Sequence, residues 1–264
     1  MLPDLQENDA IAFIHKSDAL KLHRPEVQNA TNTKPAAKAI AKAKELGIGA
    51  DVLIGIIDVG GFDFSHPDFL TDDGTTRFVA IWDQGGDFRQ SPKNFPYGAE
   101  FTHEQLNRAL QKAKKPGTPP PTWIERQSQM QPGSHGTHVA SIAAGKFGVC
   151  PEAEIAAVLI DIPTPEDDVQ RRRATFSDSS RIAHAVEYLL QVAEKRKKPI
   201  AINISLGTNG GAHDGSAGVS RWLDAYLASP GRAICVAAGN AGQEKPEGDG
   251  DFGWIMGRIH TSGQ

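Results

Sequence analysis

The sequence of 264 residues has few cysteines, few aromatic residues and no long hydrophobic run. The two cysteines, Cys150 and Cys235, are far apart and each lies beside strand-like apolar residues, so we expect buried thiols in a reducing compartment rather than a disulfide framework. Three methionines and four tryptophans are too few to indicate a cofactor site. No apolar stretch approaches the length of a membrane span, and residues 1–30 lack the pattern of a secretion signal. We therefore expect a soluble cytoplasmic protein with no membrane partner.

An excess of positive charge is also lacking. The formal net charge is −4, and the one basic block, residues 171–173, lies beside acidic residues. A nucleic-acid-binding surface would need a basic patch that is not balanced in this way. The charge pattern therefore predicts no nucleic-acid partner.

Buried strands and amphipathic helices alternate along the chain. Apolar, β-branched runs of this kind are typical of strands covered on both faces. They occur at residues 51–58, 154–160, 200–206 and 233–239, with helical periodicity at 181–192 and 216–228. The alternation predicts an α/β fold, a doubly wound and mostly parallel sheet with helices on both faces.

Polar side chains follow several of these strands. Asp58 closes the first strand, Ser205 and Asn240 follow later ones, and His135 opens a helix of small residues in the stretch GSHGTHVAS. Parallel strands end at one rim of the sheet, so we expect these side chains to gather there. The helix dipole disfavours an imidazolium, and we therefore expect a neutral His135 ring that accepts a proton. An acid, a base and an amide donor are most of what acyl transfer requires.

Four blocks in order, IGIIDVGGFDFSHPDF, GSHGTHVAS, INISLG and VAAGN, carry a family resemblance. They resemble the Asp, His, substrate-strand and oxyanion-Asn blocks of the subtilisin-like serine proteases, the subtilase or S8 family. The resemblance implies a serine-type endopeptidase that acts on peptide or protein substrates. It implies that Asp58 orients the base, that His135 is the general base and that Asn240 donates to the oxyanion.

The same resemblance implies a substrate strand. Ser205, Leu206 and Gly207 correspond to the backbone along which the family binds an extended peptide. No cofactor is implied except calcium, which is common in the family. No group of aspartates has the spacing of a dedicated calcium loop, so no calcium site is assigned.

The nucleophile of the family has no counterpart in the sequence. In the family it lies in a Gly-Thr-Ser-x-x-x-Pro block beyond the oxyanion Asn. The nearest match to that block within residues 241–264 is HTSGQ. Ser262 lacks the glycine before it and the proline after it, so we interpret it as a tail residue. We expect a chain truncated before the catalytic serine, with the C-terminal remainder of the same protease as a partner. A catalytically inert pseudoprotease, or regulatory peptide-binding scaffold, is the alternative.

We expect two parts in the chain. Residues 1–46 form an N-terminal extension that ends in an Ala/Lys-rich helix at 34–46. Residues 47–264 form the subtilisin-like catalytic domain, incomplete at its C-terminus.

A zinc hydrolase is the third hypothesis, because His135 and His138 form an HxxH pair. Helical zinc peptidases place a glutamate after the first histidine and space the two histidines by four. Here Gly136 follows, and the spacing is three. We therefore assign no metal and interpret His138 as a histidine packed against the site.

Three further segments need an interpretation. The polar, Pro-rich segment 83–132 is long for a connection, and we expect it to cover part of the cleft or contact another domain. The HPD stretch at residues 66–68 predicts a structural turn. His213 and Asp214 edge either a specificity pocket or an ordinary solvated loop.

Overall fold

The computed structural model describes residues 47–131, 133–161, 179–206 and 214–237, together with Ala41 and Glu45. The helix predicted at 34–46 lies outside this part of the chain, apart from Ala41 and Glu45, which have helical backbone. The described strands are β1 (Leu53–Asp58), β2 (Phe78–Asp83), β3 (Ala99–Thr102), β4 (Glu154–Leu159), β5 (Ile200–Ile204) and β6 (Arg232–Val236). The helices are η1 (Pro67–Phe69), α3 (His103–Ala113), α4 (Pro121–Ile124), α5 (His135–Ala144), α7 (Ser179–Arg196) and α8 (Gly218–Leu227).

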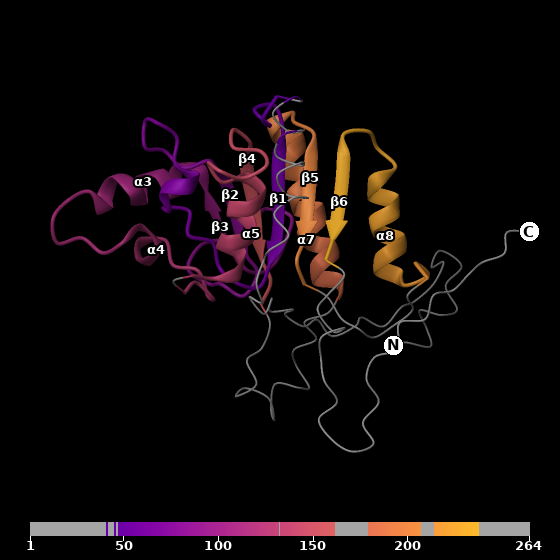
Figure 1. Ribbon diagram of the computed structural model, residues 1–264. Helices are drawn as coiled ribbons and strands as arrows, with labels where there is room; N and C mark the ends of the chain where they lie inside the picture. The colour runs from indigo at the N-terminus through magenta and orange to yellow at the C-terminus, as the bar shows by residue number, and fades with distance from the viewer. Residues whose placement is uncertain are drawn as a thin grey trace, which may run out of the picture.

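The six strands form one sheet in the order β3-β2-β4-β1-β5-β6 (Figure 1). All neighbours are parallel except β2 and β3, which are antiparallel. β1 lies in the middle of the sheet, between β4 and β5. The predicted α/β fold with a mostly parallel sheet is confirmed, and its four predicted strands are present.

Side-chain alternation along β1 separates two hydrophobic cores. Leu53 and Ile57 pack on the side of α7, whereas Ile54 and Ile56 pack on the side of α5. All six residues of β1 are buried, as a continuous apolar run predicts for a strand covered on both faces. Asp58 shares the α5 side with Ile54 and Ile56, because successive side chains of a strand point to opposite faces.

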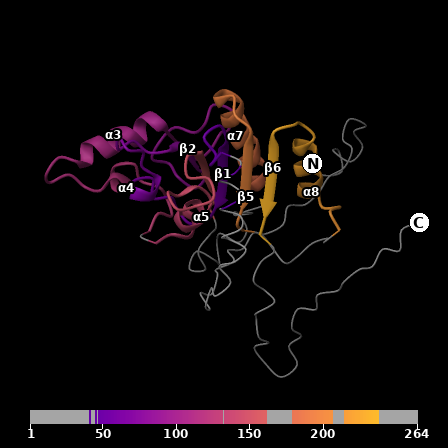
Figure 2. The same cartoon turned by 45° about the horizontal axis from the view of Figure 1, so that its top comes forward.

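The β6 edge of the sheet is less covered than its centre. Figures 1 and 2 show α8 beside β6 at one end of the sheet, with α3 and α4 at the opposite end. Four of the five residues of β6 are exposed, and Val236 is 59% exposed. Both cysteines are free, as expected, but the prediction that both are buried is wrong, because Cys235 lies on this open strand.

The segment 83–132 is more regular than its composition suggested. It contains β3, α3 and α4, and the apolar side chains of α3 pack against the sheet through Leu106, Ala109 and Leu110. Thr102 and Gln105 form a capping box at the start of this helix. Most of the segment therefore extends the β3 end of the sheet, and only its last part, near residues 127–130, lies beside the turn after β1.

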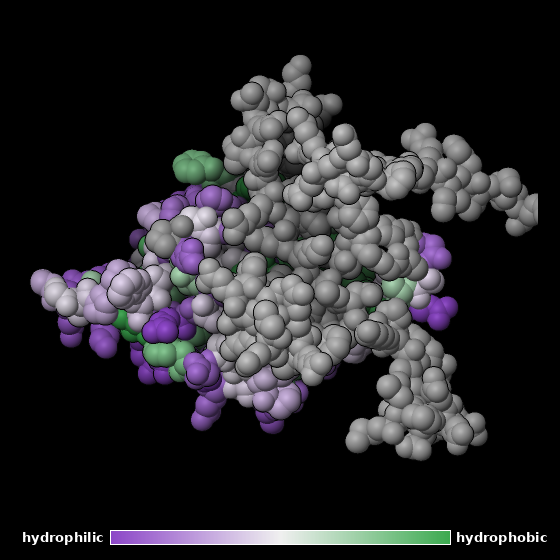
Figure 3. All heavy atoms as spheres, turned by 90° about the horizontal axis from the view of Figure 1, so that it is seen from below, coloured by the Kyte–Doolittle hydropathy of each residue, from purple (hydrophilic) through white to green (hydrophobic). Residues whose placement is uncertain are grey.

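Within the described residues, no helix is long and apolar enough to cross a membrane. Seen from the side where the strands end, the visible surface near α3 and α4 is mostly hydrophilic, with separate hydrophobic residues between (Figure 3).

Candidate active site

Asp58 ends β1 at the carboxyl rim of the sheet and is fully buried. Its Oδ1 accepts the backbone N–H groups of Val59 at 2.8 Å and Gly60 at 2.9 Å. These two bonds come from the turn that directly follows the strand. They fix the carboxylate in one orientation and replace the water that burial removed.

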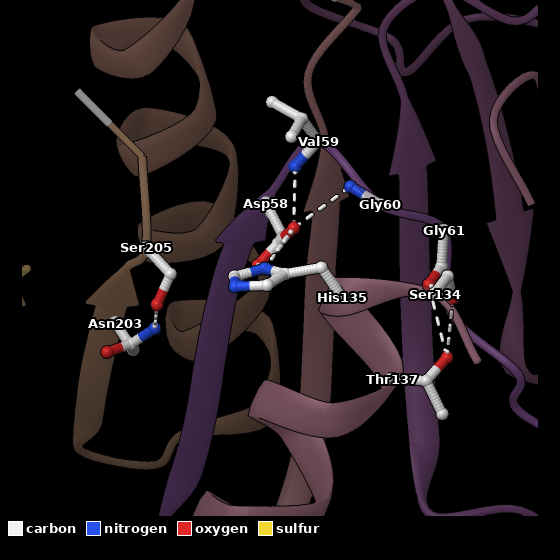
Figure 4. A network of polar contacts seen from close by, with 9 residues as sticks. All are labelled: Asp58, Val59, Gly60, Gly61, Ser134, His135, Thr137, Asn203 and Ser205. Carbon is white, nitrogen blue, oxygen red and sulfur yellow. Dashed lines mark hydrogen bonds and ion pairs between the residues drawn. The ribbon is translucent and has the colours of Figure 1, made fainter. Parts of the chain in front are cut away.

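His135 is the first residue of α5 and faces Asp58 (Figure 4). Its Nδ1 lies 2.8 Å from Oδ2 and 3.0 Å from Oδ1 of Asp58. A carboxylate accepts hydrogen bonds, so we infer that Nδ1 carries the proton and that Nε2 presents its lone pair. Nε2 has no hydrogen-bond partner among the described residues. The side chain is 19% exposed, so the ring is sheltered but reachable.

The pKa of His135 is raised above its ordinary value. The largest cause is the hydrogen bond to Asp58, and the charge of Asp58 acts in the same direction, whereas burial opposes both. The helix dipole acts in the opposite direction, since it disfavours the imidazolium. A buried carboxylate in direct contact outweighs the partial charge of a helix terminus.

The start of α5 packs tightly on the turn after β1. A Cβ added at Gly60 would lie 2.8 Å from the backbone nitrogen of His135, and one at Gly136 would overlap the Gly60 carbonyl oxygen. Only glycine allows these two backbones to approach so closely. The glycines around the dyad therefore set the distance between the helix and the Asp58 turn.

Ser205 and Leu206, predicted for the substrate strand, lie just beyond the end of β5. Ser205 donates its backbone N–H to Ile57, and its hydroxyl accepts the side-chain amide of Asn203 at 2.6 Å. Figure 4 shows Ser205 and Asn203 on the side to which the second ring nitrogen of His135 is turned. Leu206 is buried in the core, and Gly207 lies outside the described residues. Asn203 was not predicted, although its place in an otherwise apolar strand could have indicated it.

A second buried carboxylate at the rim was also missed. Asp83 ends β2 and accepts the Ser128 hydroxyl at 2.7 Å, together with the backbone N–H groups of Ser128 and Gly85. Burial is the main cause that raises its pKa, with a further contribution from Asp161. Asp83 thereby ties the end of the 83–132 segment to the rim, where Gly61 donates to the Gln129 carbonyl.

Other predicted residues lie away from the dyad or outside the described chain. His138 is exposed, so the prediction of a packed histidine is wrong; it lies on the outer face of α5, where nothing described covers it. Asn240, His213 and Ser262 lie outside the described residues. Asp214 is exposed and accepts the backbone N–H of Ser216 just before α8. The part of the chain that the structure describes has no cluster of three His, Cys, Asp or Glu residues suited to a metal ion.

The HPD stretch is a structural turn, as predicted. Pro67 begins η1, and the His66 ring accepts the backbone N–H of Asp68 at 3.2 Å. Asp68 accepts the Ser141 hydroxyl and the backbone N–H of Lys146, so it holds the C-terminal end of α5.

Comparison with known proteins identifies the family. The model of the subtilase family, peptidase S8, matches residues 49–251, so the chain belongs to the subtilase family. Among solved structures, it is similar to the CspB protease of Clostridium perfringens, with 28% identity and a TM-score of 0.60. The similarity covers 79% of this chain and 41% of that chain, so the chain spans less than half of CspB. A search of curated proteins gave no significant match.

Proposed function

We propose that the protein contributes the acid and the base of a serine-type endopeptidase that cleaves peptide bonds in proteins. The observation that carries the proposal is the 2.8 Å contact between His135 Nδ1 and the buried Asp58 carboxylate. Membership of the subtilase family supports it. In this proposal Asn240 donates to the oxyanion, and the nucleophilic serine belongs to the C-terminal remainder of the same protease.

The chemistry follows from the orientation of the ring. The serine oxygen attacks the scissile carbonyl carbon while His135 Nε2 takes the hydroxyl proton, and Asp58 stabilises the imidazolium. The tetrahedral intermediate then collapses, and Nε2 gives this proton to the leaving amine. Water repeats both steps on the acyl-enzyme and releases the acid product. The raised pKa of His135 favours the proton transfer, because it makes the ring a stronger base.

The open face of β5 and β6 supports the proposed partner and substrate. Asn203 and Ser205 alternate with the buried residues Ile202 and Ile204, so they face away from α7, on the side of α5. No described helix covers this side of β5 and β6. An extended peptide would add along Ser205 to Gly207, and the remainder of the protease would pack beside it.

The test uses the full-length parent protease. We expect fluorophosphonate labelling of the parent at a serine beyond Gln264, and no labelling of the 264-residue chain. His135→Ala should lower kcat on the order of 10⁶-fold, because the members of a triad act as a unit. Asn240→Ala should lower kcat by about 10²–10³ with little change in KM, since the oxyanion forms only in the transition state.

Two results would redirect the proposal. A source gene that ends at Gln264, or that replaces the serine, would favour the peptide-binding pseudoprotease. Labelling of Ser262 in this chain would show that the tail itself supplies the nucleophile.

A further inference from the structure

Two buried hydroxyls flank His135 and contact the turn that holds Asp58. Ser134 precedes the histidine and Thr137 follows it by two residues, and both are at least nine-tenths buried. The hydroxyls of both residues donate to the carbonyl oxygen of Gly61, with the Thr137 bond at 3.1 Å. Thr137 Oγ1 also accepts the backbone N–H of Asp63 at 2.9 Å.

Ser134 occupies the N-cap position of α5 but does not cap the helix. The side chain of an N-cap serine normally accepts a backbone N–H from the first turn of its helix, which would otherwise lack a partner within the helix. The Ser134 side chain makes no such bond and donates to Gly61 instead. Ser134 thus forms a hydrogen bond to a distant segment in place of the helix cap, which indicates that this tertiary contact has a role of its own.

The hydroxyl contacts close a loop of bonds around the dyad (Figure 4). Gly61 follows the turn whose backbone N–H groups hold the Asp58 carboxylate. From the Gly61 carbonyl the path runs through Thr137 into α5, and then through His135 back to Asp58. Among the charged side chains of the described residues, Asp58 forms the hydrogen bond with the His135 ring.

We propose that Ser134 and Thr137 are positioning residues, which fix the first turn of α5 on the Asp58 turn and thereby set the His135–Asp58 hydrogen bond. The catalytic importance of these contacts rests on the proposed function. The contacts themselves all lie within the described residues of this chain. Gly61 O is the shared acceptor, so loss of one hydroxyl leaves the other bond in place. Loss of Thr137 Oγ1 also leaves the Asp63 N–H without its acceptor.

The experiment measures the pKa of His135 in the 264-residue chain by NMR titration of its ring protons. Thr137→Val keeps the shape of the side chain and removes the hydroxyl, and Ser134→Ala removes the other one. Both should lower the pKa of His135 towards that of an ordinary imidazole, about 6.5, with the larger shift in Thr137→Val. Thr137→Ser keeps the hydroxyl and should restore the wild-type value.

Ser141→Ala is the matched control. This residue lies on the same helix, and its hydroxyl donates to Asp68 at the far end from the dyad. The control should lower the melting temperature without moving the pKa of His135. In the parent protease, Thr137→Val should lower kcat with little change in KM, and Ser141→Ala should leave both unchanged.

A merely structural role gives a different pattern. If Thr137→Val and Ser134→Ala lose stability while His135 titrates as in the wild type, the inference is wrong. It is equally wrong if Ser141→Ala moves the pKa as far as Thr137→Val. Should Thr137→Val not fold, Ser134→Ala decides by the same measurement. A parent whose activity survives His135→Ala would overturn the proposed function but not this inference, because the pKa is measured without substrate.

Discussion

The centre of the sheet and its β6 edge differ in how they are covered. β1 is buried along its whole length between α5 and α7, and its last residue, Asp58, meets His135. β6 has four exposed residues out of five, and α8 packs on one side of it. The half of the site that needs a buried charge is therefore complete within the described chain, whereas the half that would receive a substrate is open.

This difference has a physical reason. A hydrogen-bonded acid and base gain from low dielectric surroundings, so Asp58 benefits from a strand covered on both faces. In the proposed function a substrate strand must present its backbone and polar side chains, which would require an open face at Ser205 and Asn203. The burial of β1 and the exposure of β6 thus agree with the proposed roles of the two halves.

Among the tests that compare the two halves, Asp58→Asn in the buried half should have the largest effect, although a smaller one than His135→Ala. In the parent protease we expect kcat to fall about 10⁴-fold, because an amide holds the imidazole in the wrong tautomer. In the 264-residue chain the same change should lower the pKa of His135, measured by NMR. If the wild-type ring already titrates like an ordinary histidine, the dyad is not preformed and the contrast between the two halves fails.

A matched pair of valines compares the two halves by stability. Val158 on β4 is fully buried and Val236 on β6 is 59% exposed. Val158→Ala should reduce the free energy of unfolding by about 2 kcal/mol, from two lost methylene equivalents and a cavity. Val236→Ala should change it by less than about 0.5 kcal/mol. Urea unfolding measures both, and equal losses would mean that β6 is covered in solution.

The pH dependence of stability should report the dyad. The pKa of His135 is raised in the folded state, so the protonated ring stabilises the fold. This stabilisation is fully present below about pH 6.5, the ordinary pKa of histidine, and is lost as the pH rises through the folded-state pKa. The melting temperature of the wild type relative to His135→Gln should therefore be higher at about pH 5.5 than at about pH 9. The glutamine variant removes the titration while other groups, including Asp83, remain. A difference that does not vary with pH would contradict the predicted linkage.

The smallest effect should come from His138→Ala. The side chain is exposed on the outer face of α5, so we expect less than about 0.5 kcal/mol of lost stability and no change in the activity of the parent. Elemental analysis of the wild-type protein should find no stoichiometric zinc. If the variant lost both its activity and a zinc ion that the wild type binds, the zinc hypothesis would be restored.

Much of the fold could be predicted from local patterns. The apolar runs that became β1, β4, β5 and β6 could be recognised, because short β-branched runs that alternate with helical patterns are typical of strands in a parallel sheet. The regular structure of the segment 83–132 was not predicted. β3 is only a short strand, and the prolines and charges of the segment conceal the pattern of α3. The low burial of β6 was also missed, because a run such as Ala-Ile-Cys-Val does not tell which neighbours cover it.

Local periodicity and motif order are enough to predict the family, the alternation of strands and helices, and the residue types of the dyad. The other properties became known from the three-dimensional arrangement. It showed that Asp58 and His135, far apart in the chain, share a hydrogen bond, that His138 is exposed and that the pKa of His135 is raised. It also showed that Ser134 bonds Gly61 and does not cap its own helix. These properties arise from distances between segments remote in sequence, which no local pattern specifies.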